Sequence, residues 1–350
     1  MLIVMQNDAT DRDVRGVVER IEAMGYRGVP MKGSLRIAVG VVGNEGPVDG
    51  ARFMGLPGVR EVVPVTRPYK LVSREWQPHQ TIVDIGAGVT FGGKTIPVIA
   101  GPCSVESETQ LLEAAHAVRE SGGTVLRGGA YKPRTSPYSF QGLGTAGLKI
   151  LARARQETGL RIVTEAIDPE SVDVVAEYAD LIQVGARSMQ NFSLLKRVGQ
   201  SGKPVLLKRG LAATINELLL SAEYVMAEGN SAVILCERGI RGFDSATRNV
   251  FDLTAMPALH QLSHLPVVAD PSHGTGVRDY VAPMTLAALA AGADGVMIEV
   301  HPDPSAALSD GAQSLPTGDL PQLIEQMRAV ARAVNREVAA LAPAQEVVGA

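Results

Sequence analysis

Short apolar stretches alternate with amphipathic stretches from residue 97 onward. Eight of them have the composition of buried strands: PVIAG, TVLRG, RIVTE, LIQVG, PVLLK, AVILC, PVVAD and GVMIE. Each ends in a glycine or a chemically active side chain and is followed by a helical pattern. The roughly 240 residues from the first of these stretches to the end of the last expected helix match the size of an α/β fold of the (β/α)8 TIM barrel type. A doubly wound open sheet is the alternative, but no glycine-rich dinucleotide turn is found, which favours closure.

The first 66 residues follow a different pattern. Five apolar residues share one face of a helical repeat: Val14, Val17, Val18, Ile21 and Met24. The expected elements are a strand at 1–5, a helix at 10–24, strands at 26–33 and 35–42, a helix at 48–55 and a strand at 60–65. The order βαββαβ is that of a small ferredoxin-like domain.

These patterns divide the chain into four parts. We expect a ferredoxin-like domain at 1–66, a linker at 67–80, the barrel at 81–340 and a tail at 341–350. The linker is inferred from its polar, mixed-charge composition. A glycine-turned hairpin is expected just before the first barrel strand, and the last helix is expected at Leu320–Val334.

Composition narrows the function classes. A net charge of -4, with 45% hydrophobic and 20% charged residues, is ordinary for a soluble globular protein and argues against a nucleic-acid partner. The sequence has no secretory signal pattern and no apolar stretch long enough for a membrane span. Two cysteines are too few for a disulfide framework. We therefore expect a cytoplasmic protein.

Positive charge is concentrated where a barrel places its active site, at the C-terminal ends of the strands and in the loops after them. Seven cations occupy such positions: Arg127, Lys132, Arg134, Arg187, Lys208, Arg209 and Arg238. Arginine suits planar carboxylate and phosphate groups, and lysine adds a point charge. Any one arginine could simply be solvated, but seven at one rim indicate more than one anionic group.

A second group at the same rim has the chemistry of metal ligands. Cys103, His273, Glu299 and Asp310 follow strands 1, 7 and 8, and closure places strands 1 and 8 side by side. A thiolate, an imidazole and carboxylates suit a divalent ion of the Mn, Fe, Co or Zn class better than Mg. The dispersed spacing has little specificity, and Cys103 alone could equally be a packing residue. Cys236, within an apolar stretch, is expected to be buried.

Several long motifs occur in an order that is specific to one family. They are AGPCSVES, LRGGAYKPRTSPYSFQGLG, QVGARSMQNFSLLK, PVLLKRG, ILCERGIRGF, DPSHGTG and IEVHPDPSAALSDGAQSL. Together they resemble 3-deoxy-D-arabino-heptulosonate 7-phosphate (DAHP) synthase, in its shorter-barrel branch with an N-terminal ferredoxin-like regulatory domain. The resemblance implies a metal-dependent transferase that condenses phosphoenolpyruvate with erythrose 4-phosphate, the entry step of the shikimate pathway of aromatic amino acid biosynthesis.

The resemblance also implies roles for individual residues. The metal ligands would be Cys103, His273, Glu299 and Asp310. Phosphoenolpyruvate would be held by Arg127, Lys132, Arg187, Lys208, Arg238 and the backbone at Ala186. The phosphate of erythrose 4-phosphate would be held by Arg134, Thr135 and Ser136. Ser188 stands where the family pattern has asparagine, which puts one supporting contact in doubt.

Catalytic roles are assigned to three side chains. We expect Lys132 to protonate the developing alkoxide, and Glu165, with His273, to orient or deprotonate the attacking water. Glu165 could instead only hold Lys132 or Arg187. The resemblance further suggests a homotetramer with feedback inhibition by tyrosine or phenylalanine through the small domain.

Three other activities compete with this interpretation. A sister enzyme, 3-deoxy-D-manno-octulosonate 8-phosphate synthase, takes arabinose 5-phosphate, but its loop reads like KANRSS where this chain has KPRTS. A metal-dependent aldolase would need one phosphate site and fewer cations. A non-catalytic sensor would not need all four metal ligands.

Overall fold

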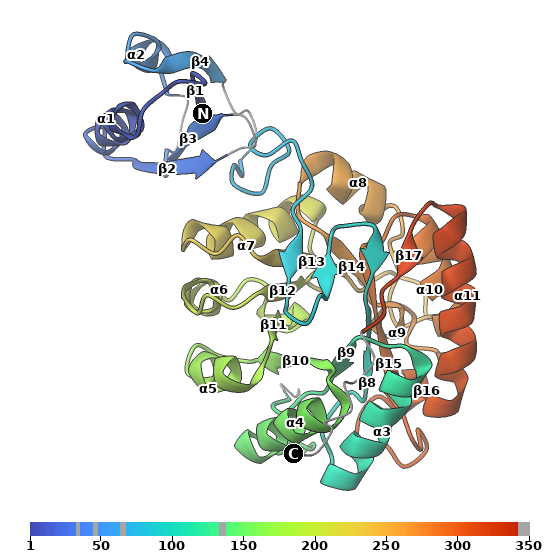
Figure 1. Ribbon diagram of the computed structural model, residues 1–350. Helices are drawn as coiled ribbons and strands as arrows, with labels where there is room; N and C mark the ends of the chain where they lie inside the picture. The colour runs from blue at the N-terminus through green and yellow to red at the C-terminus, as the bar shows by residue number, and fades with distance from the viewer. Residues whose placement is uncertain (33–35, 45–47, 64–67, 133–137, 342–350) are drawn as a thin grey trace, which may run out of the picture. The chain divides into compact units, whose positions relative to one another are not determined.

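The computed structural model describes residues 1–32, 36–44, 48–63, 68–132 and 138–341 (Figure 1). It divides into two compact units, Met1–His79 and Gln80–Ala350.

The smaller unit is an antiparallel sheet with two helices. Its elements are β1 (Leu2–Met5), α1 (Asp11–Glu22), β2 (Arg27–Lys32), β3 (Ile37–Val42), α2 (Ala51–Met54) and β4 (Val59–Val63). The strand order is β2-β3-β1-β4. Val14, Val17 and Ile21 of α1 are buried against this sheet, because the helical repeat places them on one face. The predicted βαββαβ domain is thus confirmed.

The stretch after β4 packs more closely than a linker would. Tyr69, Leu71, Val72 and Trp76 are buried. The Nζ of Lys70 donates a hydrogen bond to the backbone oxygen of Val41 in β3, at 3.2 Å. Residues 68–76 therefore belong structurally to the smaller unit.

The larger unit is a closed parallel barrel. Its strands are β8 (Val98–Gly101), β9 (Val125–Arg127), β10 (Arg161–Ala166), β11 (Leu181–Val184), β12 (Val205–Lys208), β13 (Val233–Glu237), β14 (Val267–Ala269) and β15 (Gly295–His301). Each strand pairs in parallel with the next, and β15 pairs with both β14 and β8. This closure confirms the predicted (β/α)8 barrel and excludes the open sheet.

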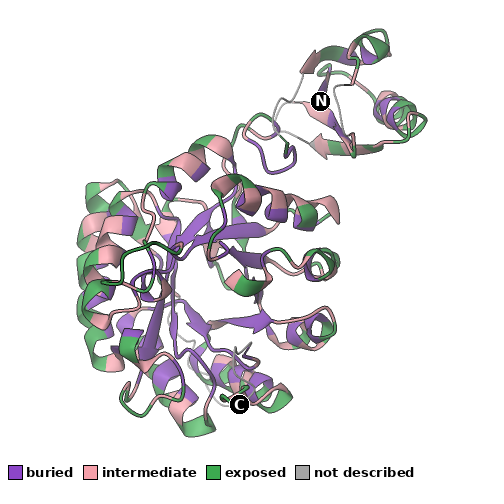
Figure 2. Ribbon diagram, turned by 180° about the vertical axis from the view of Figure 1, so that it is seen from behind, coloured by how far each residue is buried: buried purple, intermediate pink, exposed green. Residues whose placement is uncertain are grey.

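Helices surround the strands, as Figure 1 shows. They are α3 (Glu108–Ser121), α4 (Thr145–Thr158), α5 (Ser171–Tyr178), α6 (Phe192–Gln200), α7 (Ile215–Ala227), α8 (Ala255–Leu262), α10 (Arg278–Ala290) and α11 (Leu320–Ala333). A short extra helix, α9 (Pro271–Thr275), follows β14 directly. Buried residues concentrate on the strands and on the inner helix faces (Figure 2). None of the described helices is long and apolar enough to cross a membrane.

The predicted hairpin fills one end of the barrel. It consists of β5 (Val83–Asp84) and β6 (Thr90–Phe91), and Thr81 beside it donates its N–H to the oxygen of His264, just before β14. Its apolar side chains pack against inward residues of all eight strands: Ile99, Val125, Val163, Leu181, Leu206, Ile234, Cys236, Val268 and Met297. The N-terminal end of the barrel is therefore filled, and a site must form at the opposite end.

Candidate active site

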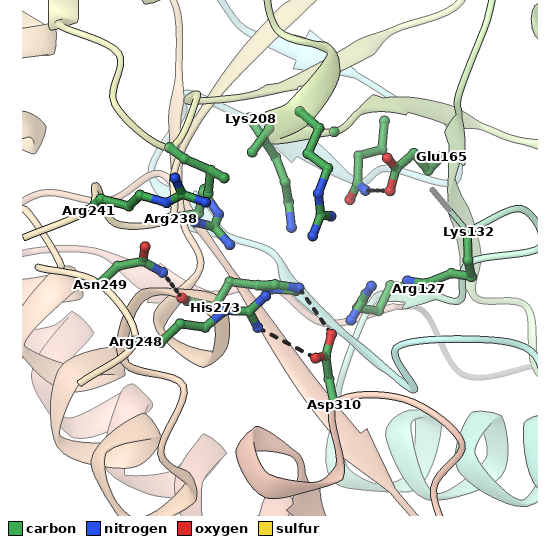
Figure 3. A pocket seen from close by; sticks show the side chains of 15 residues that line it. Arg127, Lys132, Glu165, Lys208, Arg238, Arg241, Arg248, Asn249, His273 and Asp310 are labelled. Atoms are coloured by element: carbon green, nitrogen blue, oxygen red, sulfur yellow. Dashed lines mark hydrogen bonds and ion pairs between the residues drawn. The ribbon is translucent and has the colours of Figure 1, made fainter. Parts of the chain in front are cut away.

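A cavity of about 350 Å³ opens at the C-terminal ends of the strands. Figure 3 shows basic side chains entering it from several elements. Its lining includes most of the predicted site: Arg127, Lys132, Glu165, Ala186, Arg187, Lys208, Arg238, His273 and Asp310. Arg134, Thr135 and Ser136 lie outside the described residues. The structure thus brings together side chains from seven strands or the loops that follow them.

The four predicted metal ligands converge beside this cavity. Ligand atoms of Cys103, Glu299 and Asp310 all lie within 4.8 Å of one another. The Sγ of Cys103 lies 3.1 Å from Oδ2 of Asp310. The Nε2 of His273 lies 3.4 Å from Oε1 of Glu299 and 4.0 Å from Oδ2 of Asp310. The soft and hard donors of this group fit a divalent transition metal.

His273 has a fixed ring orientation. It lies in the short helix α9, which begins after Asp270, and the backbone N–H of His273 donates to Oδ1 of Asp270. The Nδ1 of its ring lies 2.8 Å from Oδ2 of the same carboxylate. With Nδ1–H donated to Asp270, the lone pair of Nε2 faces the other ligands, which is the usual arrangement for a metal-bound histidine.

The charges within the ligand cluster favour a bound cation. Burial, together with nearby Glu299, raises the pKa of the Cys103 thiol to about 11. Burial also opposes ionisation of Asp310, but His273, a hydrogen bond from Cys103 and nearby Arg248 together lower its pKa to about 2. Burial lowers the pKa of His273, so that its ring is neutral at pH 7. The carboxylate and imidazole are thus ready to ligate, and only the thiol must lose a proton.

Two of the predicted anion-binding cations contact the ligand cluster. The Nζ of Lys132 lies 3.0 Å from Sγ of Cys103 and donates to the carbonyl oxygen of the same residue at 2.9 Å. Arg127 is buried and pairs with Glu299. Within the described residues, the buried Nε of Arg127 has no hydrogen-bond partner. The anion site and the metal site are therefore contiguous, and one donor is available for a ligand.

Three further cations line the cavity. Lys208 pairs with buried Asp270. Arg238 is buried, and the contact recorded for its guanidinium is a long one of 3.5 Å to the oxygen of Gly239. Burial lowers the pKa of Arg238. Arg187 lies in the 3-10 turn Ala186–Ser188, directly after β11. The charge of buried Arg238 has little compensation from the described residues, and such an arginine is suited to binding an anionic ligand.

Glu165 is held by an amide rather than by a cation. The Nε2 of Gln183 donates to its Oε2 at 2.9 Å. A Cβ at position 185 would lie 2.0 Å from Oε1 of Glu165, so a side chain there would push the carboxylate out of this position. Among the described residues, Glu165 makes no ion pair with Lys132 or Arg187. The simple structural alternative for Glu165, a partner for either cation, therefore loses support.

Some residues expected at the rim point elsewhere. Arg209 pairs with Glu237 at 2.7 Å and with Asp252 at 2.9 Å, and it does not line the cavity. Arg209 follows Lys208, and successive strand residues face opposite sides. Cys236 is buried in the barrel core, as expected.

Sequence reasoning missed a second set of polar residues. Gln183, Arg241, Arg248 and Asn249 line the cavity, and Gln313 contacts Glu299. Gln183 lies two residues before Gly185 within a strand, and period-two alternation could have placed it inside. The others lie in irregular loops, where no periodic signal indicates direction.

Comparisons with known proteins identify the family. Residues 80–336 match the DAHP synthetase I family, and residues 1–67 match the DAHP synthase ferredoxin-like domain. The chain belongs to the DAHP synthetase I family. Membership assigns it an aldol-type condensation, which is a transferase reaction, and confirms the resemblance found in the sequence.

Individual relatives agree with this assignment. The chain is 49% identical over 338 residues to phospho-2-dehydro-3-deoxyheptonate aldolase of Thermotoga maritima, covering 97% of this chain and all of the relative. A crystal structure of the DAHP synthase of that organism matches with a TM-score of 0.77 and 48% identity, covering 97% of this chain and 99% of the other. A 2-dehydro-3-deoxyphosphooctonate aldolase of Syntrophotalea carbinolica is 36% identical and covers 70% of this chain and 94% of its own length.

Proposed function

We propose that this chain condenses phosphoenolpyruvate with erythrose 4-phosphate, giving DAHP and inorganic phosphate at the start of aromatic amino acid biosynthesis. The supporting observation is the contact between Lys132 and Cys103, which joins a cationic cavity to a metal-ligand cluster. Two substrates with three anionic groups between them require several fixed cations. The cations also reduce the repulsion that would keep two anions apart.

The metal centre is part of the proposal. Cys103, His273, Glu299 and Asp310 would hold a divalent ion of the Mn, Fe, Co or Zn class. Such an ion would polarise the aldehyde oxygen of erythrose 4-phosphate as a Lewis acid. The mixed thiolate, imidazole and carboxylate donors support this class of ion over Mg.

The residues of this chain would bind both substrates. Phosphoenolpyruvate is held by these cations and by one backbone position: Arg127, Lys132, Arg187, Lys208, Arg238 and Ala186. We assign the phosphate of erythrose 4-phosphate to Arg134, Thr135 and Ser136. This arrangement holds C3 of phosphoenolpyruvate against the aldehyde carbon, which lowers the entropic part of the barrier.

The bond changes follow from that arrangement. A C–C bond forms between C3 of phosphoenolpyruvate and the aldehyde carbon, and Lys132 gives a proton to the developing alkoxide. Water then adds to C2 and loses a proton to Glu165. Both ring nitrogens of His273 are used, Nδ1 by Asp270 and Nε2 toward the other metal ligands, so we assign the water to Glu165 alone. The C2–O bond to phosphate breaks, and inorganic phosphate leaves with the remaining proton. The hydrogen bond from Gln183 holds the carboxylate of Glu165 in place to accept the proton of the water.

The choice of sugar has one direct test. Phosphate release from phosphoenolpyruvate is measured with erythrose 4-phosphate and with arabinose 5-phosphate, before and after EDTA treatment. We expect release with the four-carbon sugar, loss after EDTA and recovery with Mn²⁺. Release with the five-carbon sugar alone would move the chain to the activity named for the 36% identical relative.

We also propose a regulatory role for residues 1–79, with tyrosine or phenylalanine as the inhibitor. The support is the match of residues 1–67 to the ferredoxin-like domain of DAHP synthases. A homotetramer and a cytoplasmic location are the accompanying proposals, made by analogy with the family. Sedimentation velocity of the full chain tests the first of these.

A further inference from the structure

Arg248 connects the substrate cavity to two of the metal ligands. Its side chain lines the cavity and is 39% exposed. Its Nη1 donates to Oε1 of Gln313 at 2.8 Å and lies 3.5 Å from Oδ1 of Asp310. Figure 3 shows Arg248 reaching toward Asp310 from the side of the cavity that also carries Asn249 and His273.

Gln313 extends this connection to Glu299. Its Nε2 donates to Oε2 of Glu299 at 2.6 Å, while its Oε1 accepts from Arg248. Because an amide has one donating and one accepting end, using both ends fixes its orientation. Gln313 is buried, so neither contact is exchanged for water without cost. Gln313 thus holds Oε2 of Glu299, whereas the other oxygen, Oε1, lies near His273.

The backbone of Arg248 is anchored to the element that carries His273. The N–H of Arg248 donates to the oxygen of Thr275 in α9 at 2.8 Å. A Cβ on Gly276 would lie 2.4 Å from the Cβ of Arg248, and the φ of this glycine is +70°, so no other residue fits this close approach. Only the side chain of Arg248 is therefore available for a change of partner.

That side chain also has donors to spare. Both recorded contacts use Nη1, and within the described residues Nε and Nη2 donate no hydrogen bond. A guanidinium has five N–H donors, suited to a phosphate or carboxylate. An anion in the cavity can thus bind Arg248 and compete with Asp310 and Gln313 for its charge.

We propose that Arg248 and Gln313 are positioning residues that couple occupancy of the anion cavity to the affinity for the metal ion. In the free protein, Arg248 neutralises part of the charge of the ligand carboxylates. A bound anion draws that positive charge away and leaves more negative charge for the cation. Anion and metal therefore strengthen each other, and linkage makes the effect reciprocal. The inference rests on the proposed function for the metal centre and for phosphoenolpyruvate as the anion.

The test measures Mn²⁺ dissociation constants of the full chain by the electron paramagnetic resonance signal of free Mn²⁺. Each titration is run without anion, with phosphoenolpyruvate and with inorganic phosphate. Arg248→Ala is compared with Arg241→Ala, which removes the same charge from the same cavity. In the described residues, the Arg241 side chain has no contact with a ligand carboxylate. Gln313→Leu removes both hydrogen bonds of this side chain, the one to Glu299 and the one from Arg248.

We expect phosphoenolpyruvate to tighten Mn²⁺ binding by a factor between about 5 and 150 in the natural protein, the usual range for coupled sites. Arg241→Ala should keep most of this factor, and Arg248→Ala should lose most of it. Gln313→Leu should weaken Mn²⁺ binding about 10- to 100-fold even without anion. Circular dichroism of each variant verifies folding, and the exposed Arg248 site tests the coupling should Gln313→Leu not fold.

The proposed coupling would be overturned if phosphoenolpyruvate tightened Mn²⁺ binding by the same factor in Arg248→Ala as in the natural protein. Equal losses in the two arginine variants would overturn it too, because net charge alone would then account for the effect. Failure of the proposed function is distinguishable, since it appears as missing phosphate release in the condensation assay. The Mn²⁺ titration requires no turnover.

Discussion

The carboxylate of Asp270 lies between the ring of His273 and the ammonium of Lys208. One oxygen is 2.8 Å from Nδ1 of His273, and the same buried side chain pairs with Lys208. Asp270 thus connects a proposed metal ligand with a proposed phosphoenolpyruvate ligand. Replacing Lys208 leaves the contact between Asp270 and His273 in place, whereas replacing Asp270 changes both contacts.

Replacing Asp270 should affect the metal, and replacing Lys208 should affect the anion. Asp270→Asn removes the charge that orients His273, so we expect Mn²⁺ affinity to fall about 10- to 100-fold. Lys208→Met leaves that contact in place and should mainly raise the KM for phosphoenolpyruvate. Isothermal titration with Mn²⁺ and steady-state kinetics measure the two effects. Equal Mn²⁺ affinity in both variants would contradict the assignment.

The two cysteines provide a matched pair for testing the ligand set. Both are buried, but Cys103 lies 3.1 Å from Asp310 whereas Cys236 lies in the barrel core. With Co²⁺ bound, the natural protein and Cys236→Ala should show the absorption band of a cobalt–thiolate bond. Cys103→Ser should lose it, together with most of the metal-dependent activity. A band that persists in Cys103→Ser would remove Cys103 from the ligand set.

Glu165 is tested by an isosteric change. Glu165→Gln keeps the shape of the side chain but removes its ability to accept a proton. We expect kcat to fall about 10²- to 10⁴-fold, the range for a lost general base, with little change in the KM for phosphoenolpyruvate. Near-normal kcat would refute water activation by Glu165. Gln183→Leu, which removes its recorded partner, should produce a smaller fall in the same direction.

The sequence could predict the barrel because each strand has a clear apolar pattern and a chemically active end. Closure of the barrel brings the C-terminal ends of the strands together regardless of loop conformation. Cys103, His273 and Glu299 could therefore be placed in one group. The same reasoning misplaced Arg209, because position along the chain was used without the alternation of faces that separates it from Lys208.

The remaining site residues depend on loop geometry. Arg248 lies on a loop held by the pairing of Ile240 with Val250, and Gln313 lies in the 3-10 turn Gly311–Gln313. Neither segment has a repeat that predicts direction. Their contacts with Asp310 and Glu299 arise from tertiary packing between distant segments, which no local pattern encodes.

A capping box at the start of α7 makes barrel stability depend on pH in a defined direction. Hydrogen bonds from the backbone and hydroxyl of Thr214 lower the pKa of Glu217 below its usual value of 4.5. A lowered folded-state pKa contributes stability above the unfolded pKa, and this contribution is lost as the pH falls through the folded value. Thr214→Ala should therefore be more destabilising at pH 7 than at pH 4.

The matched control is the cap of α3. Ser107 accepts a hydrogen bond from the backbone of Gln110, whose amide does not ionise in this range. Ser107→Ala should lower the urea midpoint by about the same amount at both pH values, relative to the natural protein at each. Urea unfolding followed by circular dichroism gives these midpoints. A pH-independent effect of Thr214→Ala would contradict the role of Glu217.

Removing residues 1–79 should separate catalysis from control. The larger unit has its own closed core, filled by the hairpin at 83–91. We expect the truncated chain to retain kcat within a few-fold and to respond neither to tyrosine nor to phenylalanine, which should inhibit the full chain. Phosphate release at saturating substrates, with each amino acid added separately, measures both properties. Inhibition that survives truncation would place the effector site on the barrel, because the small unit would then be absent.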